Sequence, residues 1–168
     1  HYINNGVDLE EYHRQIGENV FQDHDLDDDS FKVIYAGAIR PVNNVENIIE
    51  TAKLLTGHKD IKFLVYGDGN QKNELEKRVK EEQIENVVFK GFVEKKYIPY
   101  ILSRSSVNLL NYSGTKYNWS RGNSSNKLFE YMASGKPVIS TVKMGYSIIE
   151  RYQCGIELDD LTASALAD

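Results

Sequence analysis

The sequence predicts an α/β fold with a doubly wound parallel sheet. Short apolar segments alternate with longer segments in which apolar residues recur at helical spacing. Most residues of the short segments are apolar, which is typical of strands buried on both faces of a parallel sheet. A chain of 168 residues with 40% hydrophobic residues is long enough for one such domain with helices on both sides of the sheet.

The first thirty residues precede the first clear strand. Residues 3–8 are typical of a strand end followed by an Asn-Gly turn, and residues 9–21 of a short polar helix. Residues 23–30 hold five aspartates, which predicts a solvated and mobile loop. The chain begins at His1, so we expect a fragment with an entry segment and acidic loop over 1–30 and the domain over 31–168.

Strands and helices alternate from residue 31 onwards. Strands are predicted over 31–36, 61–66, 87–89 and 107–110, and helices over 45–55, 71–83 and 97–105. A long irregular loop over 111–124 precedes a helix over 126–132 and a strand over 138–141. A helical turn over 147–152, a strand over 155–158 and the start of a helix over 161–167 complete the pattern.

The glycines of this pattern follow the strands. Gly37, Gly67, Gly91 and the loop over 111–124 all come after predicted strands. In an open parallel sheet, ligands bind beyond the carboxyl ends of the strands. We therefore expect the binding site of a Rossmann-like domain at this edge.

Composition argues against several classes of function. The net charge of −5 disfavours nucleic acid as a partner, because a nucleic-acid footprint needs clustered lysine and arginine. The single cysteine, Cys154, cannot form an internal disulfide, which suits a reducing compartment. The four histidines lack zinc spacing, and the Asp-x-Asp pairs within 23–27 are a weak metal motif, so we expect neither a metal nor a cofactor.

The turn Gly67-Asp68-Gly69 resembles the opening of a dinucleotide fingerprint. Its third glycine is missing, because Lys72 stands in that place. A strand-to-helix turn that needs small residues explains the motif equally well. The missing glycine counts against an oxidoreductase.

The loop after the first strand combines groups suited to a phosphate. Gly37 lets a ligand approach the backbone, and Arg40 can pair with a phosphate. Asn43 or Asn44 can cap the next helix. The alternative is an ordinary capped loop with an exposed arginine.

The segment RGNSSNKLFEYMASGKPVIS, residues 121–140, is the third candidate. Ser124, Ser125 and Asn126 surround the N-terminus of a helix, where open N–H groups favour an anion. Lys127 adds a charge, and the carboxylate of Glu130 can accept hydrogen bonds from vicinal hydroxyls such as those of a ribose. The alternative is a helix capped by Ser124 or Ser125, with a glutamate that the helix dipole favours.

The order of these motifs resembles the C-terminal, donor-binding domain of retaining glycosyltransferases with the two-Rossmann (GT-B) architecture, the group 1 family. The matching segments are NGVD at 5–8, YAGAIRPVNNVENIIETAKLL, VYGDGNQKNELEKRV, VVFKGFV and NKLFEYMASGKPVIS. Together they cover nearly all of the chain, and the last is specific.

Two departures from the family pattern concern the site. The family places arginine directly after the first-loop glycine and lysine five residues later, where this chain has Ala38 and Asn43. Arg40 and Lys127 are the candidates to supply that charge. The family also pairs two glutamates, of which Glu130 matches the second, whereas Gly122 stands at the first.

The resemblance implies a nucleoside-diphosphate sugar as donor, with a UDP-sugar favoured. It implies that the base lies between the turn 67–69 and the segment Gly91-Phe92-Val93, and that Glu130 holds the ribose. The diphosphate would rest on the helix at 126–132, where Lys127 and Arg40 would stabilise the leaving group without a metal.

The acceptor follows from the same resemblance. A glycan or lipid-linked glycan would bind the missing N-terminal domain, so the fragment would bind donor with little or no transferase activity. The implied role is surface polysaccharide synthesis in the cytoplasm or at the inner face of the membrane. A non-catalytic nucleotide-binding or regulatory module is the alternative.

Overall fold

The computed structural model describes residues 5–114, 119, 125–160 and 162–168. The six strands are β1 (Phe31–Ala36), β2 (Ile61–Tyr66), β3 (Val87–Gly91), β4 (Val107–Leu110), β5 (Val138–Ser140) and β6 (Gly155–Glu157). The α-helices are α1 (Leu9–Glu18), α2 (His24–Asp27), α3 (Val45–Leu54), α4 (Lys72–Glu81), α5 (Ile98–Ser103), α6 (Asn126–Ala133), α7 (Ile148–Arg151) and α8 (Ala163–Ala167). Two 3₁₀ turns are η1 (Pro41–Asn43) and η2 (Lys95–Tyr97).

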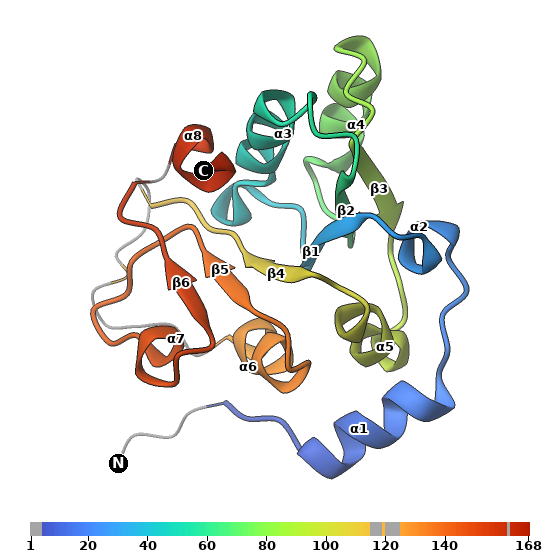
Figure 1. The fold of residues 1–168 in the computed structure, drawn as a ribbon, viewed down its shortest axis with the longest axis vertical. Helices are drawn as coiled ribbons and strands as arrows, with labels where there is room; N and C mark the ends of the chain where they lie inside the picture. The colour runs from blue at the N-terminus through green and yellow to red at the C-terminus, as the bar shows by residue number, and fades with distance from the viewer. Residues whose placement is uncertain (1–4, 115–118, 120–124, 161) are drawn as a thin grey trace.

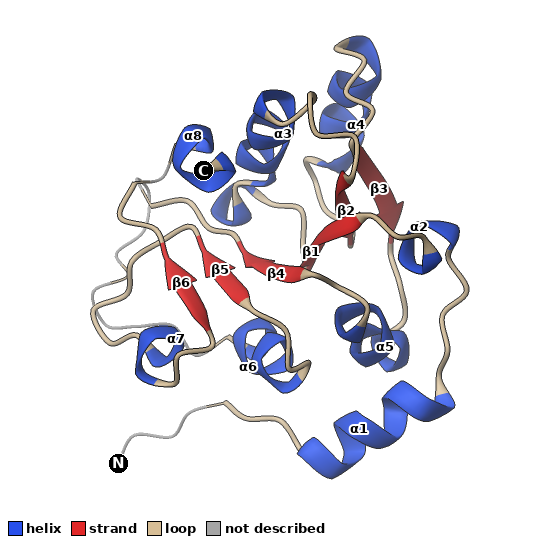
Figure 2. Cartoon of the chain, in the orientation of Figure 1, coloured by secondary structure: helices blue, strands red, loops and turns tan. Residues whose placement is uncertain are grey.

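The strands form one sheet in the order β3-β2-β1-β4-β5-β6, and every neighbouring pair is parallel. Helices α3, α4 and α8 lie on one face and α5, α6 and α7 on the other, with α1 packed beyond α5 (Figure 1). The sheet forms the central layer between the two layers of helices (Figure 2). The predicted doubly wound α/β fold is confirmed.

The direction of the winding changes between β1 and β4. The chain moves from β1 outwards to β2 and β3, then returns to pair β4 with the other side of β1. A crevice forms at such a switch point beyond the carboxyl ends of the two strands. The loops after β1 and β4 therefore meet where a ligand is expected.

The core has two parts, one on each face of the sheet. Alternate residues of β1 serve the two parts: Val33 and Tyr35 face α3, whereas Ile34 and Ala36 face α5 and α6. Because side chains alternate along a strand, a strand buried on both faces is largely apolar along its whole length. This explains why β1 and β2 begin and end at the predicted residues.

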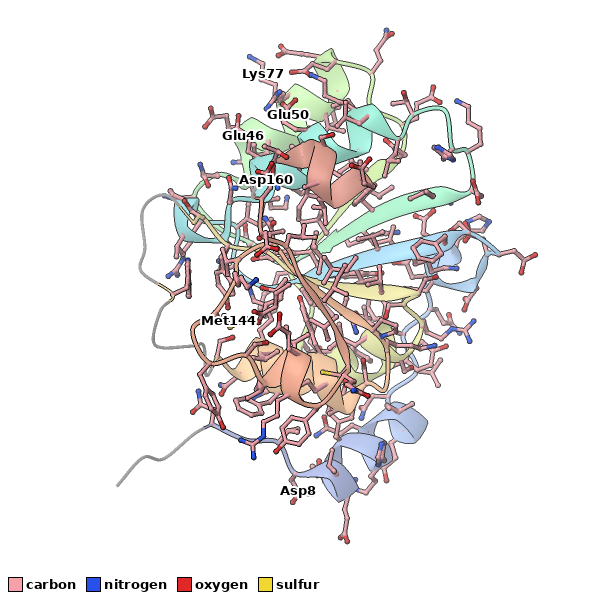
Figure 3. All side chains as sticks on the ribbon, turned by 60° about the vertical axis from the view of Figure 1, so that its left-hand side comes forward. Asp8, Glu46, Glu50, Lys77, Met144 and Asp160 are labelled. Atoms are coloured by element: carbon pink, nitrogen blue, oxygen red, sulfur yellow. The ribbon has the colours of Figure 1, made fainter. Side chains whose placement is uncertain are left out.

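Helices α3 and α4 are also linked at the surface. Arg78 of α4 pairs with Glu46, 2.9 Å away, and with Glu50, both on α3. Figure 3 shows the two glutamates together at the end of the molecule opposite Asp8. These contacts hold the helix that follows the Gly37 loop beside the helix that follows the Gly67 turn.

The acidic segment is not the solvated loop that the sequence predicted. It contains the short helix α2, which Asp23 caps by accepting a hydrogen bond from the Asp25 amide. Leu26 is only 1% exposed and belongs to the core. The prediction was wrong because the charges of the segment are compensated by residues distant in sequence.

Two lysines from the sheet supply that compensation. Lys62 of β2 lies 2.8 Å from Asp25 and 2.5 Å from Asp28, and Lys90 of β3 lies 2.6 Å from both Asp23 and Asp25. His24 groups with Asp25 and Asp28 within 4.8 Å, but Lys62 already pairs with both carboxylates, so we propose no metal here.

Replacing Lys62 by methionine is expected to lower the free energy of unfolding at pH 7 by about 1–3 kcal/mol, the range for losing hydrogen bonds to a charged group. Hydrogen bonds from Lys62 and Lys90 hold the pKa of Asp25 below its usual range. A depressed carboxyl pKa stabilises the fold above the unfolded pKa and loses that effect as pH falls through the folded pKa. The difference between the two proteins should therefore shrink below about pH 4.

Urea unfolding at pH 7 and pH 3 measures this effect. Lys59→Met is the matched control, because Lys59 is exposed and makes no ion pair within the part of the chain that the structure describes. Equal stability of the Lys62→Met variant and the control at pH 7 would show that the ion pairs contribute nothing.

None of the helices in the described ranges combines the length and the apolar character that a membrane crossing requires.

Candidate functional site

A pocket of about 340 Å³ lies at the carboxyl ends of β1, β2 and β3. Its walls come from the loops after these strands, from α5 and from α6. The lining residues are Ala36, Gly37, Ala38, Tyr66, Gly67, Asp68, Phe92, Val93, Ile98 and Glu130. The structure thus brings together six residues that the sequence singled out from four separate segments.

Backbone hydrogen bonds connect the chain at the carboxyl ends of β1, β2 and β3. The Gly37 amide donates to the Tyr66 carbonyl at 2.9 Å, and the Gly67 amide donates to the Gly91 carbonyl at 2.8 Å. The pocket floor is therefore a continuation of the sheet, and its shape depends on backbone packing.

Two glycines permit that packing. Gly67 has φ +139°, and a Cβ there would lie 1.9 Å from the Gly37 carbonyl oxygen. A Cβ at Gly69 would lie 2.2 Å from the Ile39 carbonyl oxygen. Gly67 lines the pocket as well, whereas Gly69 does not. The turn between β2 and α4 needs glycine for its fold, whatever it binds.

Glu130 lies in the second turn of α6 and faces the pocket. Its side chain is 23% exposed, and burial raises the pKa of its carboxyl group. Lys95 is its partner, with Nζ 3.8 Å from Oε1, and that lysine is 83% exposed. The carboxylate therefore retains acceptor capacity for donors that enter the pocket.

Lys127 lies one turn earlier and is directed toward the end of β1. Its Nζ donates to the Tyr35 hydroxyl oxygen at 3.2 Å and approaches Asn43 Oδ1 at 3.4 Å. Its Cε would lie 2.8 Å from a Cβ at Gly37. Burial lowers the pKa of Lys127 to about 7. The Lys127 side chain thus lies against the same glycine that lines the pocket.

The capping roles considered for the asparagines after β1 are wrong. Asn44 occupies the position before α3 in a left-handed conformation, and its side chain makes no capping bond. The Asn43 amide instead donates to the Ala38 carbonyl at 2.6 Å, which turns its oxygen toward Lys127.

Other predicted residues lie around the pocket rather than in it. Ser125 precedes α6 without capping it through its side chain, and it accepts a hydrogen bond from the Tyr112 hydroxyl at 3.0 Å. Asn126 is exposed and lines a second pocket of about 240 Å³ between α1 and α6. Arg40 is exposed, with no ion pair among the residues described. Ser124 and Gly122 lie outside the described residues.

Sequence reasoning missed the aromatic residues near Lys127. Its Nζ lies 4.6 Å from the ring centroid of Tyr35 and 5.0 Å from that of Tyr112. In the sequence, Tyr35 has the pattern of an ordinary core residue of a strand. Tyr112 follows β4, the strand on the other side of the switch point. Only the adjacency of β1 and β4 reveals that both surround one amine.

Comparison with protein families places most of the chain in one family. The model described as "Glycosyl transferases group 1" matches residues 17–168. Comparison with curated proteins gave no match.

Solved structures with a similar fold include the following three proteins. The C-terminal domain of a glycosyl transferase group 1 family protein, LpcC from Francisella tularensis, is 21% identical with TM-score 0.66, and the match covers 97% of this chain and 85% of that one. HepE from Anabaena, solved in complex with UDP, is 18% identical with TM-score 0.68. That match covers 97% of this chain and 44% of the HepE chain. A mutant of S. aureus TarM, in complex with Fondaparinux, alpha-GlcNAc-glycerol and UDP, is 21% identical with TM-score 0.66. That match covers 83% of this chain and 27% of the TarM chain.

This chain therefore spans less than half of the HepE and TarM chains, and most of the LpcC domain. At these identities the likeness shows a shared fold.

Proposed function

The chain belongs to the glycosyl transferases group 1 family, and on that premise we propose that it binds the nucleoside-diphosphate sugar donor of a retaining, metal-independent glycosyl transfer. One observation carries the proposal. Two groups of the described residues lie one turn apart on α6 beside the carboxyl end of β1: the Glu130 carboxylate, which has one distant partner in Lys95, and the Lys127 amine, which has no counter-ion among these residues. Vicinal hydroxyls suit the first group and a diphosphate suits the second.

The base is proposed to occupy the apolar side of the pocket. Phe92 is 76% exposed at the pocket rim, and Val93 and Ile98 line the wall beside it. Exposed aromatic rings are available to stack on a base, because every base has a π-face. The ribose would then extend toward Glu130, which lines the same pocket.

The diphosphate is proposed to lie at the N-terminus of α6. The open N–H groups of that helix end favour negative charge, and Lys127 adds a donor beside them. As the bond between sugar and diphosphate breaks, charge grows on the leaving oxygen, and donors already in place stabilise it. We keep Arg40 in the proposal as a second cation, because it is exposed in the loop after Gly37.

A UDP-sugar is the favoured donor, since TarM and HepE were both solved with UDP. The acceptor is proposed to be a glycan or lipid-linked glycan of surface polysaccharide synthesis, bound by an N-terminal domain of the full-length enzyme. On this proposal, the chain alone binds donor with little or no transfer.

Calorimetric titration with UDP, GDP, ADP and NAD tests the proposal. We expect at least one nucleoside diphosphate to bind, UDP most tightly, and NAD to give no comparable signal. Tight binding of NAD together with no response to the three diphosphates would eliminate the donor-binding function.

A further inference from the structure

Among the described residues, the groups in contact with the Lys127 amine are neutral. Its nearest neighbours are the Tyr35 hydroxyl, the Asn43 amide oxygen and the faces of the Tyr35 and Tyr112 rings. No carboxylate of the described residues lies within 4.0 Å of its Nζ, the limit for an ion pair. A partly buried lysine without a counter-ion is unusual, since burial penalises its charged form.

The neighbours are held in place by bonds of their own. The Tyr35 hydroxyl donates to the Ala38 carbonyl at 2.8 Å, so its oxygen is left to accept from Lys127. The Asn43 amide group donates to the same carbonyl at 2.6 Å, which fixes its oxygen toward the amine. The Tyr112 hydroxyl donates to Ser125 at 3.0 Å, which fixes its ring.

A buried asparagine supports this arrangement from the end of β4. Asn111 is 0% exposed, and its amide donates to the carbonyls of Asn43 at 2.7 Å and Asn44 at 2.6 Å. The loop after β1 is therefore tied to the end of β4. The groups around the amine are arranged before any ligand arrives.

Within the described ranges, the titratable groups that face the amine do not supply a negative charge. From β1 and from α6, burial raises the pKa of Tyr35 and of Tyr131, which keeps both hydroxyls neutral at pH 7. After β4 comes the Tyr112 hydroxyl, which is hydrogen-bonded to Ser125. Glu130 of α6 pairs with Lys95 and with no other described residue. The N-terminal end of the α6 dipole further disfavours a cation.

We propose that Tyr35, Asn43 and Tyr112 are positioning residues. They hold the Lys127 amine without a counter-ion, so that the amine becomes protonated when a diphosphate binds beside it. In the free chain the amine is in part unprotonated. When the diphosphate binds, the amine lone pair takes one proton from solvent and the ammonium pairs with a phosphate oxygen. This inference rests on the proposed function, and it adds that the chain takes up one proton from solvent when the donor binds.

Competitive acetylation of the chain with acetic anhydride from pH 5 to pH 11, followed by peptide mass spectrometry, tests it. In the free chain, Lys127 should become reactive with a midpoint of about 7, whereas exposed lysines titrate near 10.4. Saturating UDP should raise the Lys127 midpoint by about 1–3 pH units, because an opposite charge favours the ammonium. Pyrophosphate should act in the same direction.

Variants of Tyr112 separate positioning from simple packing. Tyr112→Leu keeps an apolar side chain but removes the aromatic face, so the midpoint should fall by about one pH unit and UDP should bind about 5–10-fold more weakly. Tyr112→Phe keeps the ring but loses the bond to Ser125 that fixes it, so its midpoint should lie between those of the wild-type chain and Tyr112→Leu. Tyr146→Leu is the control, because that tyrosine is 59% exposed and contacts Arg151 instead.

Two results would overturn the inference. One is a Lys127 midpoint near 10 in the free chain. The other is a low midpoint that neither UDP nor pyrophosphate moves. A midpoint that pyrophosphate raises in a chain that binds no nucleotide would support the positioned amine while refuting the donor-binding function.

Discussion

Gly67→Ala is expected to lower the free energy of unfolding by about 2–5 kcal/mol, the sum of left-handed backbone strain and overpacking. Gly67 has φ +139°, a region that residues with a side chain rarely adopt. The new Cβ would lie 1.9 Å from the Gly37 carbonyl oxygen, which is backbone and cannot swing away like a side chain. The loops after β1 and β2 would have to separate.

Urea unfolding followed by circular dichroism measures this loss. Gly57→Ala is the matched control, because no atom lies within 4 Å of a Cβ there, and its effect should stay within about 0.5 kcal/mol. Equal unfolding midpoints for Gly67→Ala and the wild-type chain would refute the close packing of the two loops.

Glu130→Ala is expected to weaken nucleoside-diphosphate binding by about 1–3 kcal/mol, or roughly 5- to 150-fold, the range for losing hydrogen bonds to a charged group. The carboxylate lines the pocket and pairs only weakly with the exposed Lys95, so its acceptors are available to the ribose. Burial disfavours the charged form of this carboxyl group and raises its pKa, so its removal should leave the fold intact.

Calorimetric titration with the tightest-binding nucleoside diphosphate measures the change in affinity. Glu150→Ala on α7 removes an exposed glutamate outside the pocket and should bind as the wild-type chain does. If folded Glu130→Ala keeps the wild-type affinity, Glu130 serves only the helix.

Much of the fold was predictable because strands and helices bury different faces. The runs at 31–36 and 61–66, which are apolar except for Lys32 and Lys62, predicted β1 and β2 to the residue, since most side chains of these strands are buried. Helix ends were less predictable: the predicted helix over 97–105 begins as the 3₁₀ turn η2 and continues as α5 to Ser103. The acidic run was misread because its charges meet Lys62 and Lys90 only in the folded chain.

By itself, the sequence determined the alternation of strands and helices, the parallel sheet and the edge at which Gly37 and Gly67 lie. These follow from hydrophobic periodicity and from glycines placed after strands, both of which are local properties. Only the tertiary structure decided that Tyr35 and Tyr112 surround Lys127. Strands β1 and β4 are adjacent in the sheet but distant along the chain. A local sequence pattern cannot predict which side chains from distant segments contact the same amine.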